Sequence, residues 1–275
     1  MKKGISIWAF SDRDPNACFA LAKACGYDGV EVGLGEAGPV TYNATKAEID
    51  ALRRLGESYG LSFYSLVCDD CWAYSLTSND PDKRRRGEEM ILRQLELASW
   101  LGCDTILVLP GMLECDDEVV PYDVAYDRAL EALKRLAPYA EKYGVCIGVE
   151  NVWNKMLLSP LEMRDFIDKI GSPWVGAYFD VGNVVVNGYP EHWIRILGSR
   201  IKKVHFKDYV RSDGTLQGFV DIGEGDVDYP AVMAALAEAG YDDWVTAEVS
   251  APDGDVEALL KRNLTAMDNI FNAQQ

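Results

Sequence analysis

Short apolar runs alternate with longer amphipathic segments along the chain, and the alternation repeats eight times. Near-continuous apolar runs bounded by turn residues are typical of parallel strands that are buried on both faces. They predict strands at Gly4–Phe10, Gly29–Leu34, Leu61–Cys68, Thr105–Gly111, Cys146–Asn151, Val175–Asp180, Lys202–Asp208 and Trp244–Ser250.

The segments between these runs carry apolar residues at helical spacing. Three of them begin with an N-cap residue and a proline, at Asp14-Pro15, Asp80-Pro81 and Ser159-Pro160, and many end at a glycine. They predict helices at Pro15–Ala24, Thr45–Tyr59, Pro81–Trp100, Tyr122–Lys142, Pro160–Ile170, Glu191–Leu197, Pro230–Ala239 and Val256–Asn272.

Eight βα units of about 30 residues predict an α/β protein, a single (β/α)8 TIM barrel that forms one domain over residues 1–275. The alternative is an open, doubly wound sheet, which needs a glycine-rich turn after an early strand. The only similar sequence, Gly223-Glu224-Gly225, follows the seventh predicted strand and lacks a third glycine. The closed barrel is therefore the better prediction.

The composition, with 48% hydrophobic and 26% charged residues, is typical of a globular enzyme. A formal net charge of -17 argues against nucleic acid and anionic membranes as partners, because both attract positive charge. The first residues lack the apolar region of a signal peptide, and no apolar run is long enough to span a bilayer. We therefore expect a cytoplasmic protein with no nucleic-acid and no membrane partner.

The seven cysteines are odd in number and scattered, which fits a reducing compartment better than a disulfide framework. Cys68 and Cys71 form the one C-x-x-C sequence, but neither a second such pair nor a nearby histidine completes a zinc site. We expect no metal or redox function there.

Ionisable residues that could bind a metal lie at or near the ends of the last four predicted strands. They are Glu150, Asp180, His205 and Glu248. In a barrel of this kind, the active site lies at the carboxyl ends of the strands. Burying three neighbouring carboxylates is costly because each loses its hydration and repels the others. A cation at their centre removes both costs, so the four residues predict a divalent-metal site.

Three carboxylates and one imidazole are mainly hard ligands, which favour Mn²⁺, with Mg²⁺ or Co²⁺ as alternatives. An octahedral ion with four protein ligands retains two positions, which a ketose can fill with its carbonyl and an adjacent hydroxyl. The metal then acts as a Lewis acid that stabilises an enediolate, while a carboxylate on either face of the sugar moves the proton.

Four motifs around these residues carry a family resemblance: Val149-Glu150-Asn151, Phe179-Asp180-Val181-Gly182-Asn183, Val204-His205-Phe206-Lys207-Asp208 and Ala247-Glu248. They resemble the sugar phosphate isomerase/epimerase superfamily of xylose isomerase-like TIM barrels. The resemblance covers essentially the whole chain, and the superfamily includes ketose 3-epimerases and L-ribulose-5-phosphate 3-epimerases. It implies a metal-dependent carbohydrate isomerase or epimerase whose substrate is a small sugar or sugar phosphate.

The resemblance also implies residue roles. Glu150 and Glu248 would bind the metal and act as the catalytic acid/base pair in 3-epimerisation through a cis-enediolate, while Asp180 and His205 would be metal ligands only. An arginine six residues after the ligand histidine contacts substrate in these enzymes, and Arg211 has that position here. Family members are often dimers or tetramers, so we expect a homo-oligomer.

Two departures from the tagatose/psicose 3-epimerases leave the sugar open. Those enzymes have a glutamate where this chain has Met156, and a histidine where it has Asn183. Lys207 can meet the sugar or pair with an acid such as Asp208, and Trp8 can stack on the sugar or belong to the core. The candidate substrate contacts are Trp8, Trp153, Lys155, Asn183, Lys207 and Arg211.

Other functions share parts of this pattern. An inosose dehydratase-type lyase begins with the same proton abstraction, and a hexulose phosphate (aldose–ketose) isomerase uses related chemistry. Endonuclease IV has the same barrel, but it needs many histidines and a basic face, whereas this chain has two histidines and a strong negative charge. A non-catalytic binding module is the remaining alternative, although it has no need for two opposed acids at a metal.

Overall fold

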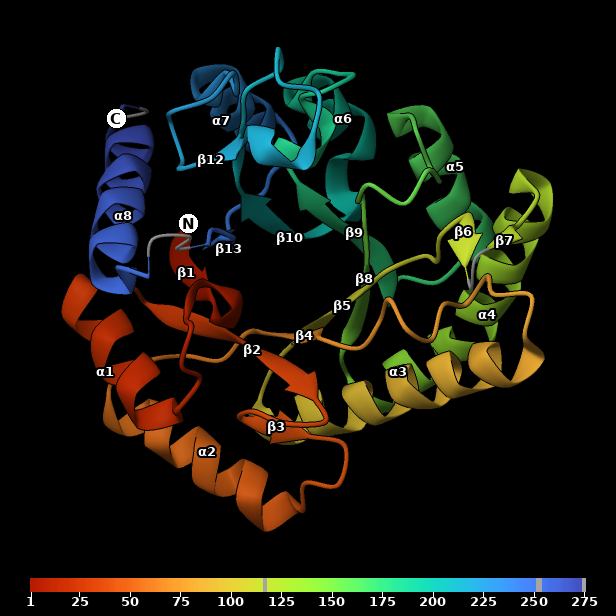
Figure 1. The fold of residues 1–275 in the computed structure, drawn as a ribbon, viewed down its shortest axis with the longest axis horizontal. Coiled ribbons are helices and arrows are strands. Elements are labelled where there is room, and N and C mark those ends of the chain that lie inside the picture. Colours follow the sequence, from red (N-terminus) through yellow and green to blue (C-terminus); the bar gives the residue numbers. More distant parts are fainter. Residues whose placement is uncertain (116–117, 251–253, 274–275) are drawn as a thin grey trace.

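Eight parallel strands close into a barrel in the computed structural model, which describes residues 1–115, 118–250 and 254–273 (Figure 1). Strand β1 pairs with both β2 and β13, so the sheet has no open edge among these eight strands. This closure confirms the predicted (β/α)8 barrel over the doubly wound alternative. The barrel strands are β1 (Lys2–Ser6), β2 (Gly29–Gly35), β4 (Ser65–Cys68), β5 (Thr105–Val108), β8 (Cys146–Glu150), β9 (Val175–Asp180), β10 (Ile201–Phe206) and β13 (Trp244–Ala247).

In the part of the chain that the structure describes, eight α-helices surround the barrel, one after each barrel strand (Figure 1). The predicted caps form: the Asp14 carboxylate accepts a hydrogen bond from the backbone N–H of Ala17, and the Ser159 hydroxyl accepts one from that of Glu162. None of the helices in the described ranges is long and apolar enough to cross a membrane. The helices are α1 (Pro15–Cys25), α2 (Lys46–Ser58), α3 (Pro81–Leu101), α4 (Tyr122–Tyr143), α5 (Pro160–Ile170), α6 (Pro190–Leu197), α7 (Tyr229–Glu238) and α8 (Val256–Asn272).

The first strand is shorter than predicted. It ends at Ser6, and residues Ile7–Ala9 form a 3₁₀ turn that is capped by the Ser6 hydroxyl. The predicted end of this strand at Phe10 was therefore wrong, and Trp8 lies on a turn at the rim of the barrel. Short strands in the rim loops were also not predicted, because two-residue strands carry no hydrophobic periodicity. They are β3 (Val40–Thr41), β6 (Glu114–Cys115) with β7 (Glu118–Val119), and β11 (Asp208–Tyr209) with β12 (Phe219–Val220).

Large aromatic side chains fill the inside of the barrel. Tyr64 stacks on Trp244 with ring centroids 4.0 Å apart, and its hydroxyl lies 2.8 Å from the Thr246 hydroxyl. A Cβ atom on Gly4 would lie 1.8 Å from the Tyr64 hydroxyl, so only glycine lets the strand pass this ring. The filled interior leaves the carboxyl-end rim as the place where a small molecule can bind.

A buried lysine lies at the opposite, amino-terminal end of the barrel. The Lys203 side chain on β10 is almost completely buried, and its Nζ lies 2.7 Å from Asp104 Oδ1 and 2.5 Å from Asp243 Oδ2. Its charge is thus satisfied by two partly exposed acids, while its aliphatic part packs inside the fold.

We predict that Lys203→Ala lowers the free energy of unfolding by about 2–4 kcal/mol, because it removes both the buried stem and the ion pairs. Lys203→Met retains the stem and is expected to cost less than half as much. Denaturant unfolding of both variants measures this difference. Equal losses in the two variants would show that the packing of the stem contributes nothing.

Candidate metal centre

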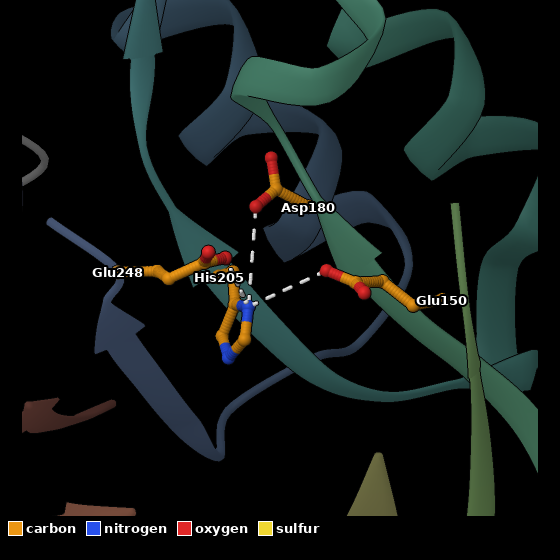
Figure 2. Close-up of side chains that lie close together, drawn as sticks. All are labelled: Glu150, Asp180, His205 and Glu248. Carbon is orange, nitrogen blue, oxygen red and sulfur yellow. Dashed lines mark ion pairs between the residues drawn. The ribbon is translucent and has the colours of Figure 1, made fainter. Parts of the chain in front are cut away.

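Four side chains from neighbouring strands meet at the carboxyl-end rim of the barrel (Figure 2). Glu150 and Asp180 are the last residues of β8 and β9, His205 is the last but one of β10, and Glu248 directly follows β13. The strand register places His205 beside Asp180, and the Glu248 N–H donates to the carbonyl of Phe206. The barrel thus brings together all four predicted metal ligands.

The geometry of the four residues fits a metal ion. His205 Nδ1 lies 2.9 Å from Glu248 Oε2, 3.8 Å from Glu150 Oε1 and 3.9 Å from Asp180 Oδ2. One possible ligand atom from each residue lies within 4.8 Å of the others. Among the described residues, Asp180 Oδ2, His205 Nδ1 and Glu248 Oε2 are buried without a hydrogen-bond partner. Buried polar atoms of this kind are costly, and a shared cation would satisfy all three.

The three acids differ in pKa because burial acts on all of them but the neighbouring cations act most strongly on Glu248. Loss of hydration raises the pKa of Asp180 to about 7 and also raises the pKa of Glu150. Burial acts the same way on Glu248, but Lys207 and His205 outweigh it and hold the pKa of Glu248 below its ordinary value. The protein therefore places carboxylates with different proton affinities around one point.

Lys207 belongs to this centre. Its Nζ donates to Glu248 Oε1 at 2.8 Å and lies 3.6 Å from Asp180 Oδ2, with the Phe219 ring 4.8 Å away. The ion pair therefore forms with two predicted metal ligands and not with the neighbouring Asp208. Lys207 supplies the positive charge nearest to the four side chains.

Glu31 is a buried partner of His205 that the sequence pattern did not single out. It is fully buried on β2, and its two oxygens lie 3.1 and 3.2 Å from His205 Nε2. The Tyr178 hydroxyl donates to Glu31 and lies 3.0 Å from the Ser65 hydroxyl. A carboxylate on the far nitrogen of a ligand histidine fixes the ring and directs the other nitrogen to the metal. The sequence feature that could have identified Glu31 is its position as the one acid inside the apolar run of β2.

Asn151 and Asn183 hold the strand ends in place. The Asn151 amide donates to the Asp180 carbonyl at 2.8 Å, and its oxygen accepts from the Asp180 N–H at 2.9 Å. The Asn183 N–H donates to Asp180 Oδ1 at 2.8 Å, and its side chain donates to the Asn151 carbonyl. These bonds orient the Asp180 carboxylate, so Asn183 has a structural task beside any contact with substrate.

Two hollows adjoin the centre. Trp8, Lys207 and Glu248 line a cleft of about 670 Å³, where the Trp8 indole is held by a 2.6 Å hydrogen bond to Asp69. A second pocket of about 310 Å³ lies over the ends of β8 and β9. It is lined by residues that include Trp153, Lys155, Met156 and Asn183.

The remaining candidates lie farther out. Trp153 donates to the Asn183 carbonyl and packs edge-on against Tyr209, while Lys155 is exposed and pairs with Glu114. Arg211 is exposed, stacks over the Tyr189 ring at 4.9 Å and is absent from the described linings of both hollows. Trp8, Asn183 and Lys207 are thus the candidate contacts that the structure places beside the predicted metal ligands.

Comparison with known proteins assigns this sequence to a family. Residues 19–270 match the family profile of the xylose isomerase-like TIM barrel. The chain belongs to this family. The match confirms the resemblance carried by the strand-end motifs.

Several relatives have names that describe an activity. A putative L-ribulose-5-phosphate 3-epimerase of Haemophilus influenzae is 26% identical over 81% of this chain and 79% of its own length. An L-ribulose 3-epimerase of Methylomonas sp. is 24% identical over 97% of this chain and 89% of its own length.

Solved structures share the fold of this family member. A D-psicose 3-epimerase structure superposes with a TM-score of 0.80 at 18% identity, covering 98% of both chains. The structure of the IOLI protein with a bound zinc atom also gives a TM-score of 0.80, at 17% identity over 98% of both chains.

We predict that Glu31→Gln weakens Mn²⁺ binding about 10–100-fold, because the His205 ring loses its charged partner. Calorimetric titration of Mn²⁺ into the metal-stripped protein measures the change. Glu36→Gln is the matched control, since Glu36 is an exposed acid just beyond the end of the same strand. Equal affinity of the wild type and the Glu31→Gln variant would contradict a role for Glu31 in positioning His205.

Proposed function

We propose that this protein is a divalent-metal-dependent ketose 3-epimerase. The observation that carries the proposal is the placement of Glu150 and Glu248 on opposite sides of the ligand cluster, with Asp180 and His205 on the strands between them (Figure 2). A 3-epimerase must remove a proton from one face of a sugar carbon and return one to the other face. Two opposed carboxylates supply both groups.

The residues of this chain divide the work. Asp180 and His205 would hold the ion with Glu150 and Glu248, and Glu31 and Asn151 orient this ligand set. A bound divalent ion would act as a Lewis acid on the ketose carbonyl and its neighbouring hydroxyl.

Proton transfer falls to Glu150 and Glu248. One removes the C3 proton of the substrate and the other returns a proton to the opposite face of the cis-enediolate. The ammonium group of Lys207 lies on the side of the centre that faces the cleft. Its hydrogen bond to Glu248 keeps that carboxylate ionised and ready to accept a proton.

The names of the relatives favour epimerisation over the other outcomes of the same first step. Both relatives described above are named as 3-epimerases, one for a ketose and one for a ketose phosphate. A dehydratase would share the proton abstraction but expel a hydroxyl group, and an aldose–ketose isomerase would move the proton between C1 and C2. We keep these two reactions as alternatives that the products distinguish.

Three further properties belong to this proposal. The carboxylate-rich ligand set favours Mn²⁺, with Mg²⁺ or Co²⁺ as alternatives. We also propose a cytoplasmic location, since a sugar isomerase of this kind serves carbohydrate metabolism. We expect a homodimer or homotetramer, which light scattering measures directly.

We predict that the Mn²⁺-loaded protein, incubated with L-ribulose or D-psicose in deuterated water, incorporates solvent deuterium at C3 without losing water from the sugar. Glu150→Gln and Glu248→Gln are each expected to lower the rate of epimerisation at C3 by about 10²–10⁴-fold, because the reaction needs a proton-transfer group on each face of the sugar. Nuclear magnetic resonance follows both the deuterium and the products.

Metal content is measured in every variant, so that a lost ion is distinguished from a lost proton-transfer group. Glu36→Gln again serves as the control. An unsaturated product would identify a dehydratase, and deuterium at C1 or C2 an aldose–ketose isomerase. An undiminished rate of epimerisation in a metal-loaded Glu248→Gln protein would contradict the assigned chemistry.

A further inference from the structure

The loop after the seventh barrel strand forms a cradle of backbone N–H groups. Gly223, Gly225 and Val227 all direct their N–H groups to one point, as does Tyr209 at the start of the same connection. In many TIM barrels, the loops after the seventh and eighth strands bind the phosphate group of the substrate. Converging N–H groups are well suited to bind such an anion.

In this protein the cradle is occupied by its own carboxylate. Asp208 is fully buried and accepts N–H bonds of 2.8 Å from Tyr209, 2.9 Å from Gly223 and 3.1 Å from Val227. A Cβ atom on Gly225 would lie 2.3 Å from Asp208 Oδ1, so the loop closes tightly around the carboxylate. The place where a barrel commonly holds a phosphate is therefore filled.

The cations at the mouth of the metal-centre cleft are also engaged. Lys207 is bonded to Glu248, and Arg262 lies 2.9 Å from Asp221. Both pairs line the same cleft. A phosphate ester is bound most strongly by cations that have no better partner, and here it would have to break an ion pair to obtain one.

An additional acid makes the cleft unfavourable for an anion. Glu224 lines the cleft beside Asp221 and has an exposed side chain. Outside the metal ligands and Lys207, the described lining thus has two acids and one cation. A like charge facing the ligand is a common way to exclude the wrong substrate.

We propose that the substrate of this site is an unphosphorylated ketose. The inference rests on the proposed epimerase function and selects one of the two substrate classes named among the relatives. The sugar would lie against Trp8 and Phe219 in the cleft, with its reacting carbons at the metal centre. Its far end would face Asp221 and Glu224, where hydroxyl groups can donate hydrogen bonds and a phosphate cannot.

The test uses matched pairs with the Mn²⁺-loaded protein: L-ribulose against L-ribulose 5-phosphate, and D-fructose against D-fructose 6-phosphate. Calorimetry measures binding and deuterium exchange at C3 measures turnover. We expect one free ketose to bind at least tenfold more tightly than its ester and to show a higher kcat/KM. Equal or tighter binding of the esters would overturn the inference, as would failure of both free ketoses to bind.

The two proposals fail in different ways. Binding of a free ketose without proton exchange at any carbon would contradict the epimerase function and leave the preference for an unphosphorylated sugar supported. Proton exchange on the esters alone would support the epimerase and overturn the substrate class.

A charge-reversal pair tests the electrostatic argument. Glu224→Lys is expected to shift the ratio of ester to free-ketose affinity about tenfold toward the ester, because it replaces an acid of the cleft by a cation. Glu141→Lys makes the same charge change on an exposed residue in the last turn of α4, at the other end of the barrel. Equal ratios in the two variants would overturn the role assigned to the acidic cleft.

Discussion

The arrangement of this protein depends on the cost of holding three carboxylates together at the rim of a barrel. Glu150, Asp180 and Glu248 lie around His205, and three ligand atoms of the cluster have no hydrogen-bond partner among the described residues. No packing of apolar groups could compensate for such a cluster, whereas one divalent cation compensates for all of it. These four side chains are oriented, or their charge is balanced, by contacts with Glu31, Asn151, Asn183 and Lys207.

Two sets of contacts hold the four side chains in place. Below the cluster, Glu31 fixes the imidazole of His205 and is itself held by Tyr178. Above it, Lys207 balances the charge of Glu248 on the side of the cleft where a sugar would lie. The candidate metal site thus has a fixed floor and a charged upper side that faces the cleft, an arrangement that fits the proposed proton transfer on a bound ketose.

The sequence predicted the elements that periodicity or topology determines. Parallel strands of a barrel all end at one rim, so an ionisable residue at four successive strand ends had to converge there. Glu31 escaped prediction because its role depends on how deep β2 lies beneath His205, which the strand register decides. The family resemblance implies a substrate contact for Arg211, and the structure places this residue at the surface in the β11–β12 hairpin beside Tyr189, so the contact stays a prediction. Spacing within a loop does not determine where a side chain points.

The filled N–H cradle around Asp208 adds a second constraint, since its backbone N–H groups are already bonded to a carboxylate of the protein and not open to a ligand anion. The most direct test of the whole account is Mn²⁺ binding to the metal-stripped protein, followed by calorimetry and elemental analysis. The account predicts one ion per chain and a higher melting temperature, both lost in Asp180→Asn and retained in Asp165→Asn, an exposed control. Absence of any bound divalent ion, or undiminished binding by Asp180→Asn, would contradict it.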